Sequence, residues 1–179
     1  MLTNVVLSLL PLVVLANEKE CINLRDYVNE DEKCCSMPLG LPEESFGACV
    51  KSAEQQVPDK NMDSLLDCAY ECYFKGLGIV TGTTVQMDKI KKYMEKLEGN
   101  ARILNILAWE ACDQSKSTLL KAVKWQTHKC NTFPRKMQDC VELVIDRNCP
   151  PNHFDDKREI CRKLRSGLPP CYATDQNRS

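Results

Sequence analysis

Cysteine is the residue type that offers most chemistry in this 179-residue chain, which contains twelve of them. Thiols can bind metals, act as nucleophiles or pair as disulfides, and the redox compartment largely decides which of these they do. All of them follow residue 16, and they are Cys21, Cys34, Cys35, Cys49, Cys68, Cys72, Cys112, Cys130, Cys140, Cys149, Cys161 and Cys171. An even number in a secreted chain predicts up to six disulfides, without giving their connectivity.

The first sixteen residues indicate the compartment. The run from Val5 to Leu15 is apolar apart from Ser8 and Pro11, and it is too short for a helix that spans a bilayer. Small side chains end the run at Ala16, and charged residues follow at once. The sequence therefore predicts a signal peptide over 1–16 and a secreted, soluble mature protein.

Catalysis and metal binding are the alternatives to disulfide pairing. The only histidines are His128 and His153, and both are expected at the surface. The chain has no Gly-x-Ser-x-Gly nucleophile elbow and no glycine-rich loop for phosphate. Cys68-x3-Cys72 lacks a second short-spaced cysteine pair of the zinc-finger type. A secreted phospholipase A2 is excluded because no histidine lies near the Cys34-Cys35 pair. We therefore expect no enzyme activity, no metal and no cofactor.

Charge narrows the class of partner. The chain has 24 basic and 25 acidic residues, which gives a formal net charge of −1. No global basic excess favours nucleic acid or an anionic membrane as the main partner.

The hydrophobic periodicity predicts helix after helix, because no alternation of apolar and polar residues persists long enough to indicate a sheet. Asn61 and Thr84 are expected to cap helices, and Pro42 and Pro134 to open them. Trp109 lies away from the main apolar stripe of its helix, so that helix is covered on two sides or Trp109 meets another segment or a partner. The expected helices span about 42–56, 62–75, 85–97, 100–114, 117–128, 134–147 and 155–165.

The apolar faces of these helices are rich in methionine and aromatic residues, which suit an adaptable binding cavity. Taken singly, each of these side chains is better explained as part of a solid core. Tyr70, Tyr73 and Tyr93 are the possible hydrogen-bond donors to a ligand. The residues expected to face a ligand are Leu66, Tyr70, Tyr73, Phe74, Met87, Ile90, Tyr93, Met94, Leu107, Leu120, Val123, Val141 and Val144.

The cysteine spacing is the most specific signal. From Cys68 it reads Cys68-x3-Cys72-x39-Cys112-x17-Cys130-x9-Cys140-x8-Cys149-Pro150-x10-Cys161. This register resembles the insect odorant-binding proteins, specifically their Plus-C subclass. The family core is a Cys-x3-Cys pair, a long gap and a Cys-x8-Cys pair, and the subclass adds a preceding cysteine, a following proline and further cysteines. Cys130, Pro150, Cys161 and Cys171 match these additions.

The resemblance implies an all-α fold of about six to eight disulfide-stapled helices around a hydrophobic cavity, with extra segments at both ends. It implies a carrier of small, odorant-like apolar molecules in sensory lymph or another body fluid, and a chemosensory receptor as a further partner. It also implies the pairs Cys68–Cys140 and Cys112–Cys149. The N-terminal partner of Cys72 stays open.

The domain organisation follows from the spread of the cysteines. We expect one domain over 17–179, with an N-terminal arm over 17–41 and a C-terminal extension over 150–179. Either a monomer or a homodimer fits.

The competing interpretations are a secreted protein-interaction module with a solid interior, and a lipophile carrier outside olfaction. Release of ligand by a histidine switch is disfavoured, whereas carboxylates acting in acid remain open.

Overall fold

The computed structural model describes most of the chain after the predicted signal peptide. The described residues are 33–57, 61–123 and 129–168. Cys21, Trp125, His128 and Cys171 lie outside these ranges, as does the predicted signal peptide. Within them, no helix is both long enough and apolar enough to cross a membrane.

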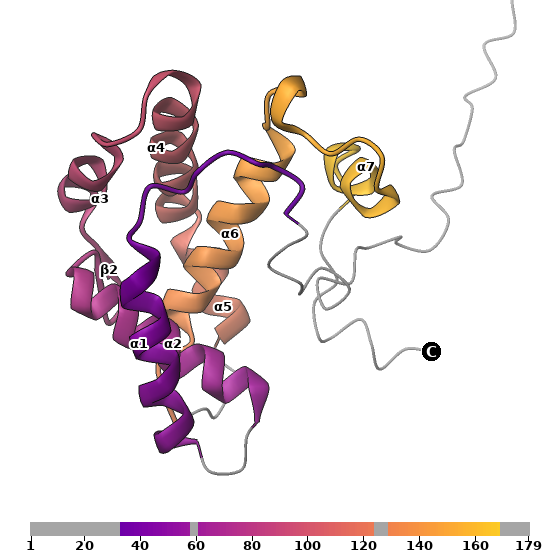
Figure 1. Ribbon diagram of the computed structural model, residues 1–179. Coiled ribbons are helices and arrows are strands. Elements are labelled where there is room, and N and C mark those ends of the chain that lie inside the picture. The colour runs from indigo at the N-terminus through magenta and orange to yellow at the C-terminus, as the bar shows by residue number, and fades with distance from the viewer. Residues whose placement is uncertain (1–32, 58–60, 124–128, 169–179) are drawn as a thin grey trace, which may run out of the picture.

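Most of the described residues form helices, and one two-stranded hairpin lies between two of them (Figure 1). This confirms the predicted all-α, disulfide-stapled fold class. The elements are α1 (Glu43–Gln56), α2 (Met62–Leu77), β1 (Val80–Thr81), β2 (Thr84–Val85), α3 (Met87–Met94), α4 (Gly99–Gln114), α5 (Lys116–Val123), α6 (Phe133–Arg147), the 3-10 turn η3 (Pro151–His153) and α7 (Glu159–Arg165).

Helix α2 begins and ends close to the predicted positions, because a capping residue is present at each end. The Asn61 side chain accepts a hydrogen bond from the Ser64 amide at 3.0 Å, which satisfies one of the free N–H groups of the first turn. Gly78 ends the helix in the left-handed conformation, with φ +68°. Helix α6 has no side-chain cap and begins at Phe133, with Pro134 in its first turn.

The hairpin and the start of α3 differ from prediction. Thr84 belongs to strand β2, and α3 begins at Met87 with no side-chain cap. Val80 pairs with Val85 and Thr81 with Thr84 in an antiparallel register. Strands of two residues are too short to leave an alternating pattern, so the sequence indicated only a loop there.

Helix α6 occupies the centre of the molecule and packs against α2, α4, α5 and α7 (Figure 1). Trp109 of α4 is only 1 % exposed and meets Phe74 of α2 at a ring-centroid distance of 5.5 Å. Because α3 and α6 both pack on α4, this helix is covered on two sides. Trp109 is therefore a core residue.

Ten of the cysteines lie in the described residues, and all ten are paired. The disulfides are Cys34–Cys161, Cys35–Cys149, Cys49–Cys72, Cys68–Cys130 and Cys112–Cys140. Cys49 is thus the N-terminal partner of Cys72.

The two predicted pairs Cys68–Cys140 and Cys112–Cys149 are wrong. Cys130 lies just before α6 and beside α2, where its Cα is 5.0 Å from that of Cys68. Cys140, in the middle of α6, faces Cys112 with Cα atoms 5.9 Å apart, within the range a disulfide requires. Cys68 and Cys112 therefore bond the two cysteines of Cys130-x9-Cys140, and not those of Cys140-x8-Cys149 as the resemblance implied.

Cys149 is then free to bond the N-terminal segment. Residues 35–42, here called the strap, run without helix or strand from Cys35 to α1 and cross over α4 and α6 (Figure 1). The Cys35–Cys149 disulfide fixes one end of the strap. The Tyr73 hydroxyl donates to the carbonyl oxygen of Pro42 at 3.1 Å and fixes the other.

Gly40 lets the strap approach α3. Its φ is +74°, and an added Cβ would lie 2.9 Å from both Met94 Sδ and Leu97 Cδ1. Replacing Gly40 by alanine is therefore expected to lower the free energy of unfolding by about 2–3 kcal/mol, from backbone strain and overpacking together. Thermal unfolding followed by circular dichroism measures the loss.

Gly82 is the matched control for this substitution. It also has a positive φ, +59°, but an added Cβ would meet nothing within 4 Å. Gly82→Ala is expected to cost only about 1 kcal/mol, from the backbone strain alone. Equal losses for the two variants would show that the strap does not press on α3.

Candidate functional site

The side chains predicted to face a ligand fall into three groups by accessibility. Phe74, Ile90 and Met94 are completely buried. Tyr73 and Val141 are nearly as inaccessible. These five form a packed core and line no open cavity in this conformation.

The other predicted residues keep some accessible surface. Those that are half-buried are Leu66, Tyr70, Met87, Tyr93, Leu120 and Val144. Leu107 is 54 % exposed on the outer side of α4, so it does not face the interior. The side chain of Val123 lies outside the described part of the structure.

Aromatic rings fill the middle of the interior. The Phe46 ring of α1 meets Tyr70 at 4.8 Å and Tyr73 at 5.3 Å between centroids, and Phe74 continues the group to Trp109. Phe46 and Trp109 were not among the predicted ligand-facing residues. These tilted and edge-to-face contacts are favourable and leave the rings closely packed.

Tyr73 does not serve as a free donor to a ligand in this conformation. Its hydroxyl donates to the Pro42 carbonyl, and burial, followed by the nearby charge of Glu43, raises its pKa to about 12. The hydroxyl therefore stays protonated and holds the strap. Lys96 lies over the Tyr93 ring at 5.8 Å, which places Tyr93 near the solvent-exposed end of α3.

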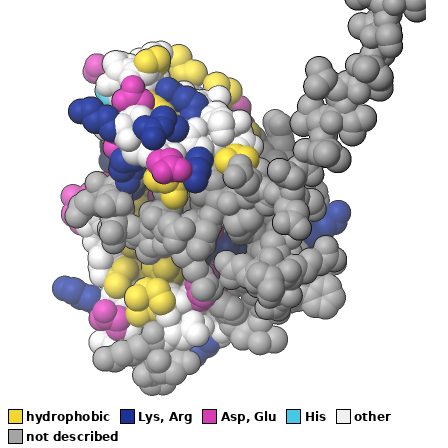
Figure 2. Space-filling view, turned by 90° about the vertical axis from the view of Figure 1, so that its right-hand side faces the viewer, with side chains coloured by type: hydrophobic (Ala, Val, Ile, Leu, Met, Phe, Trp, Pro, Cys, Tyr) yellow, Lys and Arg dark blue, Asp and Glu magenta, His cyan; other side chains and the backbone are white. Residues whose placement is uncertain are grey.

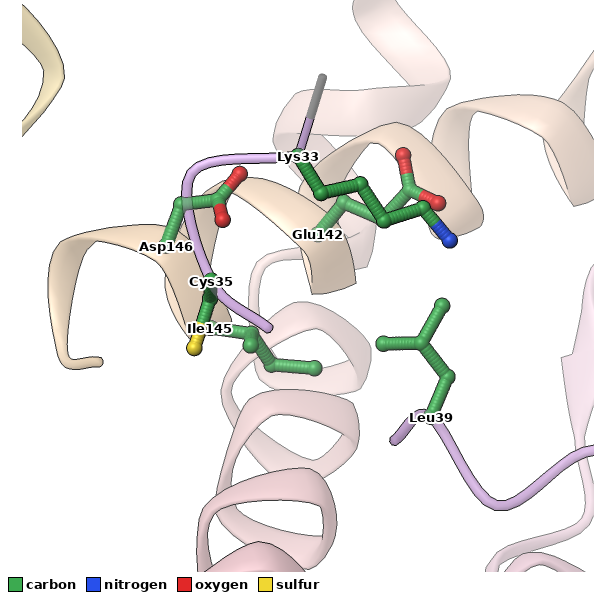
Figure 3. A pocket seen from close by; sticks show the side chains of 6 residues that line it. All are labelled: Lys33, Cys35, Leu39, Glu142, Ile145 and Asp146. Carbon is green, nitrogen blue, oxygen red and sulfur yellow. The ribbon is translucent and has the colours of Figure 1, made fainter. Parts of the chain in front are cut away.

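A small pocket lies between the strap and α6 (Figure 3). Its volume is about 10 Å³, which is at the limit for one water molecule. The residues that line it are Lys33, Cys35, Leu39, Glu142, Ile145 and Asp146. None of these six was predicted to face a ligand, because the arm before Pro42 carries no periodic signal that would place it against α6.

The pocket has an apolar and a charged side. Leu39 and Ile145 point toward one another across it, and the Glu142 carboxylate lies near the Lys33 ammonium group (Figure 3). Burial raises the pKa of Glu142, while a hydrogen bond from Gln138 at 2.8 Å and the charge of Lys33 oppose that rise. This carboxyl is thus easier to protonate than an exposed one.

Asn105 of α4 is a buried polar residue that is hydrogen-bonded to the strap. It is 1 % exposed, and its Nδ2 donates to the carbonyl oxygens of Pro38 at 3.0 Å and Ala101 at 2.9 Å. Its Oδ1 is buried, and none of the described residues donates to it. A single polar residue within the buried stripe of α4 was the signal that could have identified it.

A second buried polar group stabilises the junction of α2 and α6. Asp67 is 0 % exposed and accepts a hydrogen bond from Thr132 Oγ1 at 2.9 Å. Arg135 pairs with Asp63 at 3.0 Å and lies 3.6 Å from Asp67. These residues flank the Cys68–Cys130 disulfide, so their role is structural.

Potential metal ligands are dispersed over the described residues. No three acidic, histidine or cysteine side chains gather there as a metal site would require. His153 is exposed, with Nδ1 3.3 Å from Ser36 Oγ, and that hydroxyl also lies 3.2 Å from the His153 carbonyl oxygen. On the side of the molecule where α7 lies, basic and acidic side chains are interspersed, as the near-zero net charge leads one to expect (Figure 2).

Comparison with known proteins adds one relative. The chain is 29 % identical over 156 residues to general odorant-binding protein 68 of Anopheles gambiae, a match that covers 82 % of this chain and 71 % of the relative. No protein-family model matches the chain.

Proposed function

We propose that this protein is an extracellular carrier of small hydrophobic molecules and belongs to the insect odorant-binding proteins. The observation that carries the proposal is the similarity to a general odorant-binding protein along four fifths of the chain. The stapled all-helical fold supports it, because disulfides of this density are typical of secreted proteins. Delivery of the ligand to a chemosensory receptor is part of the same proposal.

The Plus-C subclass is the finer assignment that we infer. Three bonds, Cys49–Cys72, Cys68–Cys130 and Cys112–Cys140, staple the helical core. Two more, Cys34–Cys161 and Cys35–Cys149, join the N-terminal arm to the segment after α6. These additional bonds support a subclass with extra cysteines at both ends, and they support one domain over 17–179.

Because the interior side chains of the described residues are closely packed, a ligand must displace some of them in order to enter. Burial of apolar ligand surface supplies roughly 25 cal/mol per Å², against which the costs of ordering the ligand and opening the core are set. A ligand of about ten to fifteen carbons can then reach micromolar affinity. Closely packed but half-accessible residues such as Tyr70, Met87 and Val144 are the ones expected to move.

Displacement of a fluorescent apolar probe tests the proposal. Terpenoids and long-chain alcohols are expected to displace N-phenyl-1-naphthylamine from the oxidised mature protein at micromolar concentrations. Protein whose disulfides have been reduced and alkylated serves as the control and is expected to lose displaceable binding, because the stapled core no longer forms. Failure of a broad panel with correctly oxidised protein would exclude the carrier function.

A further inference from the structure

The strap is fixed by a disulfide and a hydrogen bond at its ends, whereas its middle is held mainly by apolar packing. A disulfide at Cys35 and the Tyr73 hydrogen bond at Pro42 fix the ends. Between Met37 and Leu41, a single hydrogen bond, from Asn105 Nδ2 to the Pro38 carbonyl, joins the strap to the described helices. A segment that is fixed at two points, with one hydrogen bond and apolar contacts between them, can bow outward without unfolding the helices beneath it when a ligand replaces those contacts.

Asn105 has its orientation set by its partners. Both groups near Nδ2 are carbonyl oxygens, which only accept hydrogen bonds, so the amide nitrogen must face them and Oδ1 must face away. Oδ1 is left buried with no donor from the described residues. Buried acceptors are rarely left without a partner, and each exception calls for a physical explanation.

Leu39 connects this amide to the pocket. The carbonyl that Asn105 binds belongs to Pro38, the residue before Leu39, and the Leu39 side chain lines the pocket against Ile145 (Figure 3). If the Leu39 side chain moved, the space that it fills would become continuous with the pocket. The enlarged space would then have the apolar Ile145 on one side and the charged Lys33 and Glu142 on the other.

We propose that the ligand site lies beneath the strap, and that Asn105 Oδ1 accepts a hydrogen bond from the hydroxyl group of an apolar alcohol whose hydrocarbon body takes the place of Leu39. This inference rests on the proposed carrier function and names the chemical class of its ligand. An alcohol or phenol supplies the donor that Oδ1 lacks. An ether or a hydrocarbon of the same size supplies none.

A pair of isomers isolates the hydroxyl group. 1-Decanol and methyl nonyl ether have the same atoms, but only the alcohol donates a hydrogen bond. The affinities of both are measured by displacement of N-phenyl-1-naphthylamine from the wild-type protein and from Asn105→Leu. We expect the preference for the alcohol over the ether to fall about 5- to 10-fold in Asn105→Leu, which corresponds to the loss of one neutral hydrogen bond.

Asn148 offers a matched control. Its Nδ2 donates to the carbonyl four residues back, that of Val144, at 2.8 Å, as Asn105 does to Ala101, but Asn148 is exposed at the end of α6. Asn148→Leu is expected to leave the preference for alcohol over ether unchanged. Because both isomers meet the same strap, any loosening caused by loss of the Asn105–Pro38 bond affects their affinities equally and cancels in the ratio.

The outcomes separate this inference from the proposed function. If neither isomer nor any member of the broad panel displaces the probe from wild-type protein, the carrier function fails and this site fails with it. If both isomers bind and their ratio is the same in wild type and Asn105→Leu, only the assignment of Asn105 is overturned.

A measurement on the wild-type protein keeps the test valid if Asn105→Leu does not fold. The side-chain amide signals of Asn105, assigned by triple-resonance NMR, are expected to shift when decanol binds and to shift much less with the ether. Equal shifts with the two isomers would mean that Oδ1 meets only water, which overturns the assignment.

Discussion

Replacement of Trp109 by alanine is expected to lower the free energy of unfolding by about 4 kcal/mol, within the range found for large aromatic residues in cores. The Trp109 side chain is 1 % exposed and packs edge-to-face on Phe74, which has no accessible surface. Truncation removes this contact and leaves a cavity between α2 and α4 that the stapled helices cannot easily close. Thermal and urea unfolding of the two proteins measure the loss, which corresponds to roughly 8–16 °C in the melting temperature for a chain of this size.

Ile103 provides the control on the same helix. It is 58 % exposed, so Ile103→Ala removes little buried surface and is expected to change stability by less than about 0.5 kcal/mol. The comparison also decides between two interpretations of Trp109. If Trp109→Ala were as stable as the wild type, the side chain would serve a partner and not the core.

Removal of the Cys35–Cys149 disulfide, by Cys35→Ser with Cys149→Ser, is expected to cost about 3 kcal/mol. The bond joins residues 114 apart, and a loop of that length alone would give about 5 kcal/mol in the chain-entropy model. However, Cys34–Cys161 closes nearly the same loop and remains in place. Removal of Cys35–Cys149 opens only the short ring that the two bonds close together. The conformational entropy of the unfolded chain therefore increases less than the separation of 114 residues would suggest.

The Cys49–Cys72 bond supplies the comparison. It spans 23 residues, and its removal by Cys49→Ser with Cys72→Ser is also expected to cost about 3 kcal/mol. The two double variants should therefore unfold at similar urea concentrations despite the fivefold difference in sequence separation. A much larger loss for the Cys35–Cys149 variant would show that the two neighbouring bonds do not act on one loop.

The sequence predicted those parts of the fold that depend on local signals. Helix α2 has a capping residue at Asn61 and a glycine in the left-handed conformation at Gly78, and its predicted ends lie close to the observed ones. The two-residue strands β1 and β2 leave no periodic pattern, and the hairpin was missed. Local sequence signals therefore predict helix ends well and very short strands poorly.

The disulfide pairing required information that spacing does not contain. Cys130-x9-Cys140 and Cys140-x8-Cys149 differ by one residue, and either could have closed the core. In the structure, Cys130 and Cys140 bond the core, because Cys130 lies beside Cys68 and Cys140 faces Cys112 across the α4–α6 contact. Such a choice depends on tertiary distances, which no single sequence reveals.

The candidate site was the least predictable part. Periodicity marks a residue as inward-facing but does not distinguish a cavity wall from a packed core, as Phe74 and Met94 show. Leu107 was placed inward, although it lies on the exposed side of α4. The strap residue Leu39 and the buried Asn105 come together only through tertiary packing.

The bonding of two adjacent cysteines to distant partners has a consequence for biosynthesis. Cys34 and Cys35 pair with Cys161 and Cys149, whereas Cys49 needs only the arrival of Cys72. During translation at about 5–20 residues per second, the two neighbouring thiols wait on the order of ten seconds for their partners. Meanwhile they lie side by side, where each can attack the other's bond once one has formed. Among the disulfides of the described residues, these two are thus the last whose partners are synthesised, and an exchange of partners between them is an error that a disulfide isomerase would correct.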